Sequence, residues 1–74
     1  MAKKLWFIAV NNEVTNVYDD PEVAQDELFY MREDNLTDTF KIYCLLDSDL
    51  DSYDDELAIA ESENFIKKKE RFKW

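Results

Sequence analysis

Hydrophobic and polar positions at the start of the chain follow the period of β-strands. Residues 4–10, KLWFIAV, are apolar on both alternating faces and rich in strand formers, which predicts a strand buried on both sides. Residues 13–19, EVTNVYD, alternate more weakly, and Asn11 and Asn12 separate the two segments. Because asparagine tolerates positive φ better than most residues, we expect a tight hairpin turn and antiparallel pairing here.

A helix is predicted from Pro21 to about Asp34. Proline suits the first helical position and pushes the preceding residue out of the helical region, which makes Asp20 the expected N-cap. Asn35 is expected to end the helix in the left-handed conformation. The apolar residues at helical spacing form the expected buried stripe: Val23, Ala24, Leu28 and Met31.

The second half of the chain contains a third strand and a second helix. Residues 38–46, DTFKIYCLL, alternate as a strand, with Cys44 expected in the core as a small buried hydrophobe. Tyr53, Leu57 and Ala60 are spaced as one face of a helix that Asn64 ends. Residues 65–74, FIKKKERFKW, fit neither period well and are expected to form a basic, aromatic C-terminal tail.

These elements predict a small α+β domain of order β-β-α-β-α over residues 1–64, followed by the tail, residues 65–74. A helical crossover makes the second and third strands parallel, and the apolar first strand lies between them, so we expect a three-stranded mixed sheet of order 2-1-3. Two helices are expected on one face. The row Trp6, Ile8 and Val10 on the other face then needs a cover, which the tail, a second copy or a target protein can supply.

Composition limits the class of protein. The chain has 74 residues, 46% of them apolar, which suits one folded domain. It has one cysteine and no histidine, so an internal disulfide and a cysteine–histidine zinc site are excluded. The apolar run near the N-terminus is shorter than a signal-peptide core or a membrane span. We therefore expect a cytoplasmic protein that does not bind membranes.

Residues 45–58, LLDSDLDSYDDELA, form an acidic stretch in the second half of the chain. Six side chains in this stretch are acidic: Asp47, Asp49, Asp51, Asp54, Asp55 and Glu56. The first three match the start of an EF-hand loop, but the turn glycine is replaced by Ser52 and the closing glutamate by Ala58, so no metal site is predicted. Acidic residues also favour a helix N-terminus, and Asp51 with Asp54 resembles a capping pair. Capping accounts for only two or three of the acids.

Charge is unevenly divided along the chain. Residues 1–63 contain seventeen acidic and four basic side chains, whereas residues 64–74 contain one acidic and five basic ones, and the total is −9. A surface with carboxylates spaced like phosphates can occupy the nucleic-acid site of a basic protein. The six acidic residues of the stretch 45–58 are therefore the expected partner-binding patch. The alternative is an acidic surface that only solvates the domain.

No motif indicates catalysis or a cofactor. Without histidine the usual base at neutral pH is missing, and without glycine there is no phosphate-binding loop, so we expect neither an enzyme nor a cofactor. The tail is expected to neutralise acids of its own domain or of a neighbouring copy rather than to bind nucleic acid directly.

In size and composition the chain is similar to small, glycine-poor, acidic early proteins of bacteriophages that disable host nucleases or polymerases, including anti-CRISPR and anti-restriction proteins. No motif carries this likeness. It favours a non-enzymatic inhibitor that mimics nucleic acid and blocks a basic nucleic-acid-handling protein in the host cytoplasm. The competing hypothesis is an assembly module that forms a homodimer through the row Trp6, Ile8 and Val10.

Overall fold

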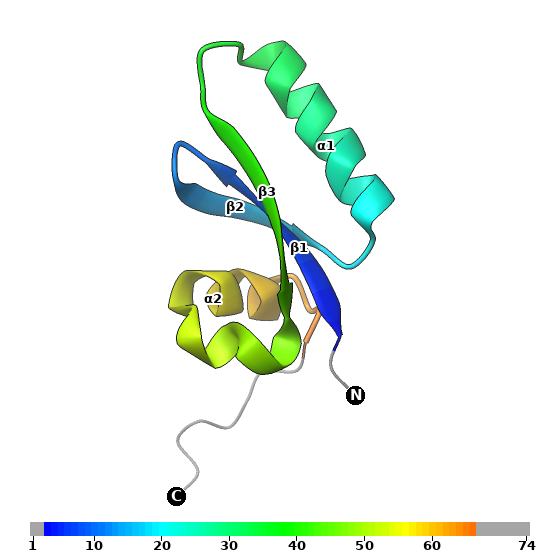
Figure 1. The fold of residues 1–74 in the computed structure, drawn as a ribbon, viewed down its shortest axis with the longest axis vertical. Helices are drawn as coiled ribbons and strands as arrows, with labels where there is room; N and C mark the ends of the chain where they lie inside the picture. The colour runs from blue at the N-terminus through cyan, green and yellow to red at the C-terminus, as the bar shows by residue number, and fades with distance from the viewer. Residues whose placement is uncertain (1–2, 67–74) are drawn as a thin grey trace, which may run out of the picture.

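The computed structural model describes residues 3–66, which form one three-stranded sheet and its covering helices (Figure 1). Residues 67–74, most of the predicted tail, lie outside the described part, while Phe65 and Ile66 pack against the core. The elements in chain order are β1 (Lys4–Val10), β2 (Glu13–Tyr18), α1 (Pro21–Asp34), β3 (Phe40–Leu46), the 3₁₀ helix η1 (Asp47–Ser52) and α2 (Asp54–Ser62).

Strand β1 is the centre of the sheet, and its apolar side chains are buried on both faces, as shown by Leu5 and Phe7 on one face and Ile8 on the other. It pairs with β2 on one side and β3 on the other, which confirms the predicted α+β class and the order 2-1-3. Both pairings are antiparallel. Strands β2 and β3 point the same way but are not neighbours, so the sheet is antiparallel rather than mixed.

The hairpin between β1 and β2 turns at the predicted asparagines. Asn11 has a φ of 54° and Asn12 a φ of 70°, values that glycine would normally supply. Asn11 also joins the turn to the start of β3, because its amide donates to the Thr39 carbonyl at 2.8 Å and its side-chain oxygen accepts from the Thr39 amide at 3.0 Å. One residue therefore fixes the same end of two strand pairs.

Helix α1 begins as predicted but ends differently. The side chain of Asp20 accepts a hydrogen bond from the amide of Glu22 at 2.9 Å, with Pro21 in the first turn. At the other end Asn35 has a φ of −133°, so the predicted left-handed stop is wrong. Its amide donates to the carbonyl of Met31 at 3.1 Å, and a turn at Leu36 and Thr37 follows before β3.

The two helices lie on opposite faces of the sheet, α2 with η1 on one and α1 on the other (Figure 1). On the first face, Leu5 and Phe7 of β1 form one buried cluster with Leu50 of η1 and with Leu57 and Ala60 of α2. This cluster is the main core of the domain.

Helix α1 covers the second face. Ile8 and Ala24 are both fully buried outside the main core, and Trp6 and Val10 are half-buried. The prediction of two helices on one face is therefore wrong, and so is the prediction that Trp6, Ile8 and Val10 await a separate cover. The connection from β2 to β3 contains α1 and crosses β1, and α1 packs on the second face. Leu50 is buried in the main core on the first face, which places η1 and α2 there.

Three residues lie outside the apolar faces that the pattern assigned to them, and one of these, Tyr53, precedes α2 and is 43% exposed. Val23 of α1 is 45% exposed, because Ala24, Leu28 and Met31 already occupy the side facing the sheet. Cys44 is exposed rather than buried, because it lies on an edge strand whose second face α1 covers only in part.

None of the helices within residues 3–66 is long and apolar enough to cross a membrane.

Candidate partner-binding surfaces

The six predicted acidic residues lie on two consecutive helical segments. Three are on η1, namely Asp47, Asp49 and Asp51, and three form the first turn of α2, namely Asp54, Asp55 and Glu56. The segment Asp47–Ser52 is helical because Leu50 packs in the main core and its carbonyl accepts from the Tyr53 amide at 2.8 Å. The structure thus brings all six residues together on one layer.

The start of α2 lacks the predicted side-chain cap. Its N-cap residue is Tyr53, with no side-chain hydrogen bond to the first turn, and Asp51 belongs to the preceding 3₁₀ helix. The capping pair of Asp51 and Asp54 is therefore wrong. Three consecutive acidic side chains in the first turn still favour the positive end of the helix dipole.

Asp47 has a structural role that the sequence did not indicate. Its amide donates to the carbonyl of Lys3 at 2.8 Å, and its carboxylate accepts from the amide of Lys3 at 3.1 Å. These bonds extend the pairing of β1 with β3 by one residue beyond the strands. One oxygen of the Asp47 carboxylate is thus already hydrogen-bonded within the domain.

The side chain of Lys3 joins three segments at this end of the sheet. Its ammonium lies 3.7 Å from the carboxylate of Asp19, donates to the carbonyl of Phe65 at 3.2 Å and lies 5.7 Å from the centre of the Phe65 ring. Lys3 and Asp19 are about half exposed, so the ion pair contributes little to stability. The hydrogen bond to the Phe65 carbonyl places the exit from α2 beside β1.

Glu56 is also committed to the fold, because it accepts a hydrogen bond from the hydroxyl of Tyr43 on β3. The Tyr43 ring stacks on Phe7, with ring centres 5.8 Å apart. Burial, and then the hydrogen bond and negative charge of Glu56, raise the pKa of Tyr43 above its ordinary value. This contact fastens the acidic turn of α2 to the sheet.

A concavity of about 460 Å³ lies next to the acidic turn, between α2 and the sheet. Its walls combine apolar side chains of the strands with the acidic side chains of α2 and one cation, Lys41. The lining residues are Ala9, Asn12, Val14, Lys41, Tyr43, Leu45, Tyr53, Asp55 and Glu56. Such a surface can accept a long side chain with an apolar stem and a positively charged end.

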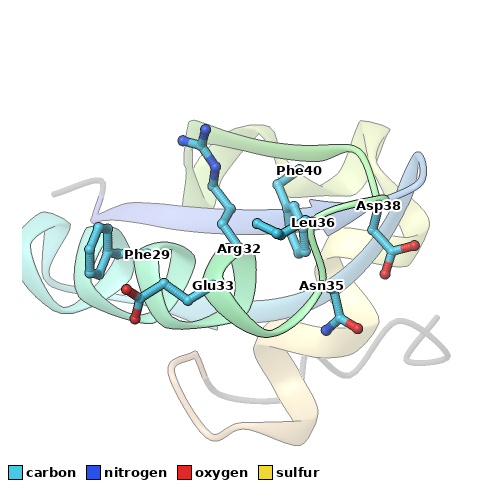
Figure 2. Close-up of a pocket in the computed structure, with 7 residues that line it drawn as sticks. All are labelled: Phe29, Arg32, Glu33, Asn35, Leu36, Asp38 and Phe40. Atoms are coloured by element: carbon cyan, nitrogen blue, oxygen red, sulfur yellow. The ribbon is translucent and has the colours of Figure 1, made fainter.

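A second concavity, of about 530 Å³, lies on the opposite side of the sheet (Figure 2). Figure 2 shows its lining side chains coming from the last turns of α1, the following loop and the first residue of β3. Phe29 is 61% exposed and Leu36 is 86% exposed, and Arg32 adds a cation to the rim. The pattern of apolar positions did not predict this surface, and its only signal was the position of Phe29 outside the expected buried stripe.

No grouping of three or more cysteine, aspartate or glutamate side chains within residues 3–66 is arranged to hold a metal ion. Comparison of the chain with protein-family models, with curated proteins and with solved structures gives no match.

Proposed function

We propose that this chain is a non-enzymatic inhibitor of bacteriophage type, which binds a basic nucleic-acid-handling protein of a host cell and blocks its nucleic-acid site. The acidic layer formed by η1 and the first turn of α2 is the proposed contact. The main supporting observation is that Asp49, Asp54 and Asp55 are all exposed on that layer.

Acidic residues are concentrated in the segment of the chain that forms this layer. No lysine or arginine occurs between Lys41 and Lys67, while eight acidic residues do. Carboxylates that are exposed and close together attract a basic surface over a distance of about 10 Å at 0.1 M salt and increase the rate of encounter. The same basic surface binds phosphates, so the chain competes with DNA or RNA.

The acidic residues of this layer differ in whether they already form hydrogen bonds within the domain. Asp47 and Glu56 already accept hydrogen bonds from Lys3 and Tyr43, so they hold the layer in place. Asp49 and Asp55 are exposed and are the residues that we assign to the partner contact. Substituting these two removes charge without removing either of the contacts that fasten the layer.

The test uses the full chain immobilised on a surface, with bacterial lysate freed of nucleic acid as the source of partners. Captured proteins are identified, purified and bound again in the presence of a DNA duplex or a structured RNA. The double variant Asp49→Asn, Asp55→Asn should slow association about tenfold or more, with a smaller effect on dissociation. Saturating nucleic acid should prevent binding.

The matched control is the double variant Asp26→Asn, Glu33→Gln, which removes the same charge from exposed positions of α1 on the opposite layer. It should slow association much less. An equal effect of both variants would show that only net charge matters. A partner that binds equally well with saturating nucleic acid would rule out mimicry.

A further inference from the structure

The outer edge of β3 is a second surface able to bind protein. Within residues 3–66, β3 pairs with β1 alone. The bonds from the Asn11 amide to the Thr39 carbonyl and from the Asp47 amide to the Lys3 carbonyl, both 2.8 Å, mark the two ends of that pairing. Because antiparallel bonding alternates, odd-numbered residues of β3 bond to β1, and the even-numbered ones direct their amides and carbonyls outward.

The two edges of the sheet differ in how they are protected. The pairing of β2 with β1 shifts register at Ile8 and Ala9, so Thr15 is an extra, bulged residue on the β2 edge. The pairing of β3 with β1 runs without a shift over all seven residues of β3. Strand β3 has no proline, and Lys41 is its one charged residue. It therefore lacks most of the features that prevent edge pairing.

The sequence of this edge is complementary to itself when two copies run antiparallel. With Cys44 opposite Cys44 of a second copy, Ile42 faces Leu46 and Tyr43 faces Leu45, so the paired side chains are apolar. At each end Lys41 faces the Asp47 carboxylate of the other copy, on the same side of the sheet. Even-numbered residues face each other, as the outward amides and carbonyls require.

We propose that this protein forms a symmetric dimer through antiparallel pairing of β3 with β3 of a second copy, with the two-fold axis at Cys44, so that one six-stranded sheet results. The exposed Cys44 and the half-buried Ile42 and Leu46 lie along this contact. Hydrogen bonds from three outward-facing residues of each copy hold the two strands together.

Net charge distinguishes this dimer from binding of a basic partner. Each copy carries −9, so the two copies repel, and two exposed ion pairs offset only a small part of that repulsion. Salt therefore strengthens the dimer, whereas it weakens binding to a basic protein. The small contact predicts a weak dimer, with dissociation in the micromolar to millimolar range.

The first experiment is sedimentation equilibrium of the full chain under reducing conditions, at low and high sodium chloride. The chain should shift from monomer toward dimer as concentration rises, and at lower concentration when salt is high. Cys44→Pro removes one outward amide and no bond to β1, so it should raise the dissociation constant about tenfold or more. Cys44→Ser keeps the amide and should dimerise like the original chain.

A second experiment tests the register and does not depend on the proline variant folding. Two variants are made on the Cys44→Ser background, one with Ile42→Cys and one with Leu46→Cys. Mixed under mild oxidation, they should form a disulfide between residues 42 and 46 much faster than either forms one alone, since paired strands hold these positions within disulfide reach.

Three results would overturn the proposal. The first is a chain that stays monomeric at millimolar concentration in high salt. The second is a folded Cys44→Pro variant that dimerises as well as Cys44→Ser. The third is equal cross-linking of mixed and separate cysteine variants, which would indicate random collision or another register.

Discussion

Tyr43 is the residue that connects the sheet, the main core and the acidic layer. Its ring stacks on Phe7 of the central strand, and its hydroxyl donates to Glu56 in the first turn of α2. An acceptor that is negatively charged and half-buried makes this a stronger hydrogen bond than one between neutral groups. One phenol hydroxyl therefore helps to fix the position of the acidic layer over the sheet.

Tyr43→Phe should lower the free energy of unfolding by about 1–3 kcal/mol, because it keeps the ring and removes the hydrogen bond to Glu56. The raised pKa of Tyr43 means that the folded state holds the phenol proton more tightly than the unfolded chain, whose pKa is near 10.0. This stabilisation is complete below pH 10 and is lost as the pH rises above it. The variant should therefore lose less stability than the original chain in alkaline solution.

Urea unfolding measured by circular dichroism across this pH range checks the prediction. Tyr30→Phe is the control, because Tyr30 is 62% exposed and its hydroxyl makes no hydrogen bond to another residue within 3–66. The two variants should differ in stability at neutral pH and in their slope with pH. Identical curves for both variants would mean that the bond to Glu56 does not stabilise the fold.

At the scale of elements, η1 shows how one apolar residue organises an acidic segment. Asp47–Ser52 contains three aspartates, two serines and Leu50, and the leucine is fully buried in the main core. With Leu50 inside, the acidic side chains on either side of it must face water. The exposed charge and the buried anchor are thus two consequences of the same 3₁₀ turn.

Leu50→Ala should lower the free energy of unfolding by about 2–5 kcal/mol, since it removes buried methyl groups and leaves a cavity. This is a large part of the roughly 4–11 kcal/mol expected for 74 residues. Urea unfolding checks it, with Leu36→Ala as the control, because Leu36 is 86% exposed and should change stability by less than about 0.5 kcal/mol. If the alanine variant does not fold, Leu50→Met should still fold and cost less than about 1.5 kcal/mol. A small effect of Leu50→Ala would show that η1 does not depend on this anchor.

At the scale of the whole molecule, charge opposes folding. Residues 1–63 contain seventeen acidic and four basic side chains, and the observed ion pair between Lys3 and Asp19 is exposed. Like charges on a small domain repel through water, and salt screens that repulsion. The free energy of unfolding of the domain should therefore be lower at low salt than at high salt.

Raising sodium chloride from about 0.01 M to about 1 M shortens the screening length from about 30 Å to about 3 Å. The free energy of unfolding should then rise by on the order of 1 kcal/mol, the energy of one close pair of charges in water. Urea unfolding at each salt concentration, under conditions that keep the chain monomeric, measures this change. The variant Asp26→Asn, Glu33→Gln should show a weaker dependence. Stability that falls with salt would mean that attractive pairs outweigh repulsion.

The sequence alone determined part of the local structure of this protein. The Asp20-Pro21 start of α1, the Asn11-Asn12 turn and the left-handed Asn64, with a φ of 64°, were all predictable. In each case the residue's own backbone preference decides the conformation, with little help from distant contacts. The central position of β1 was also predictable, but for a different reason: a strand that is apolar on both faces needs a cover on each.

Only the tertiary structure decided where the elements pack and which exposed side chains remain for partners. Periodicity identified the apolar side of α1 and of α2, but it does not say which sheet face each helix covers, so the opposite placement was missed. The exposure of Cys44 followed from that placement and from the edge position of β3. Likewise, no local pattern distinguishes Asp47 and Glu56, which bind Lys3 and Tyr43, from their acidic neighbours, because their partners are 44 and 13 residues away in the chain.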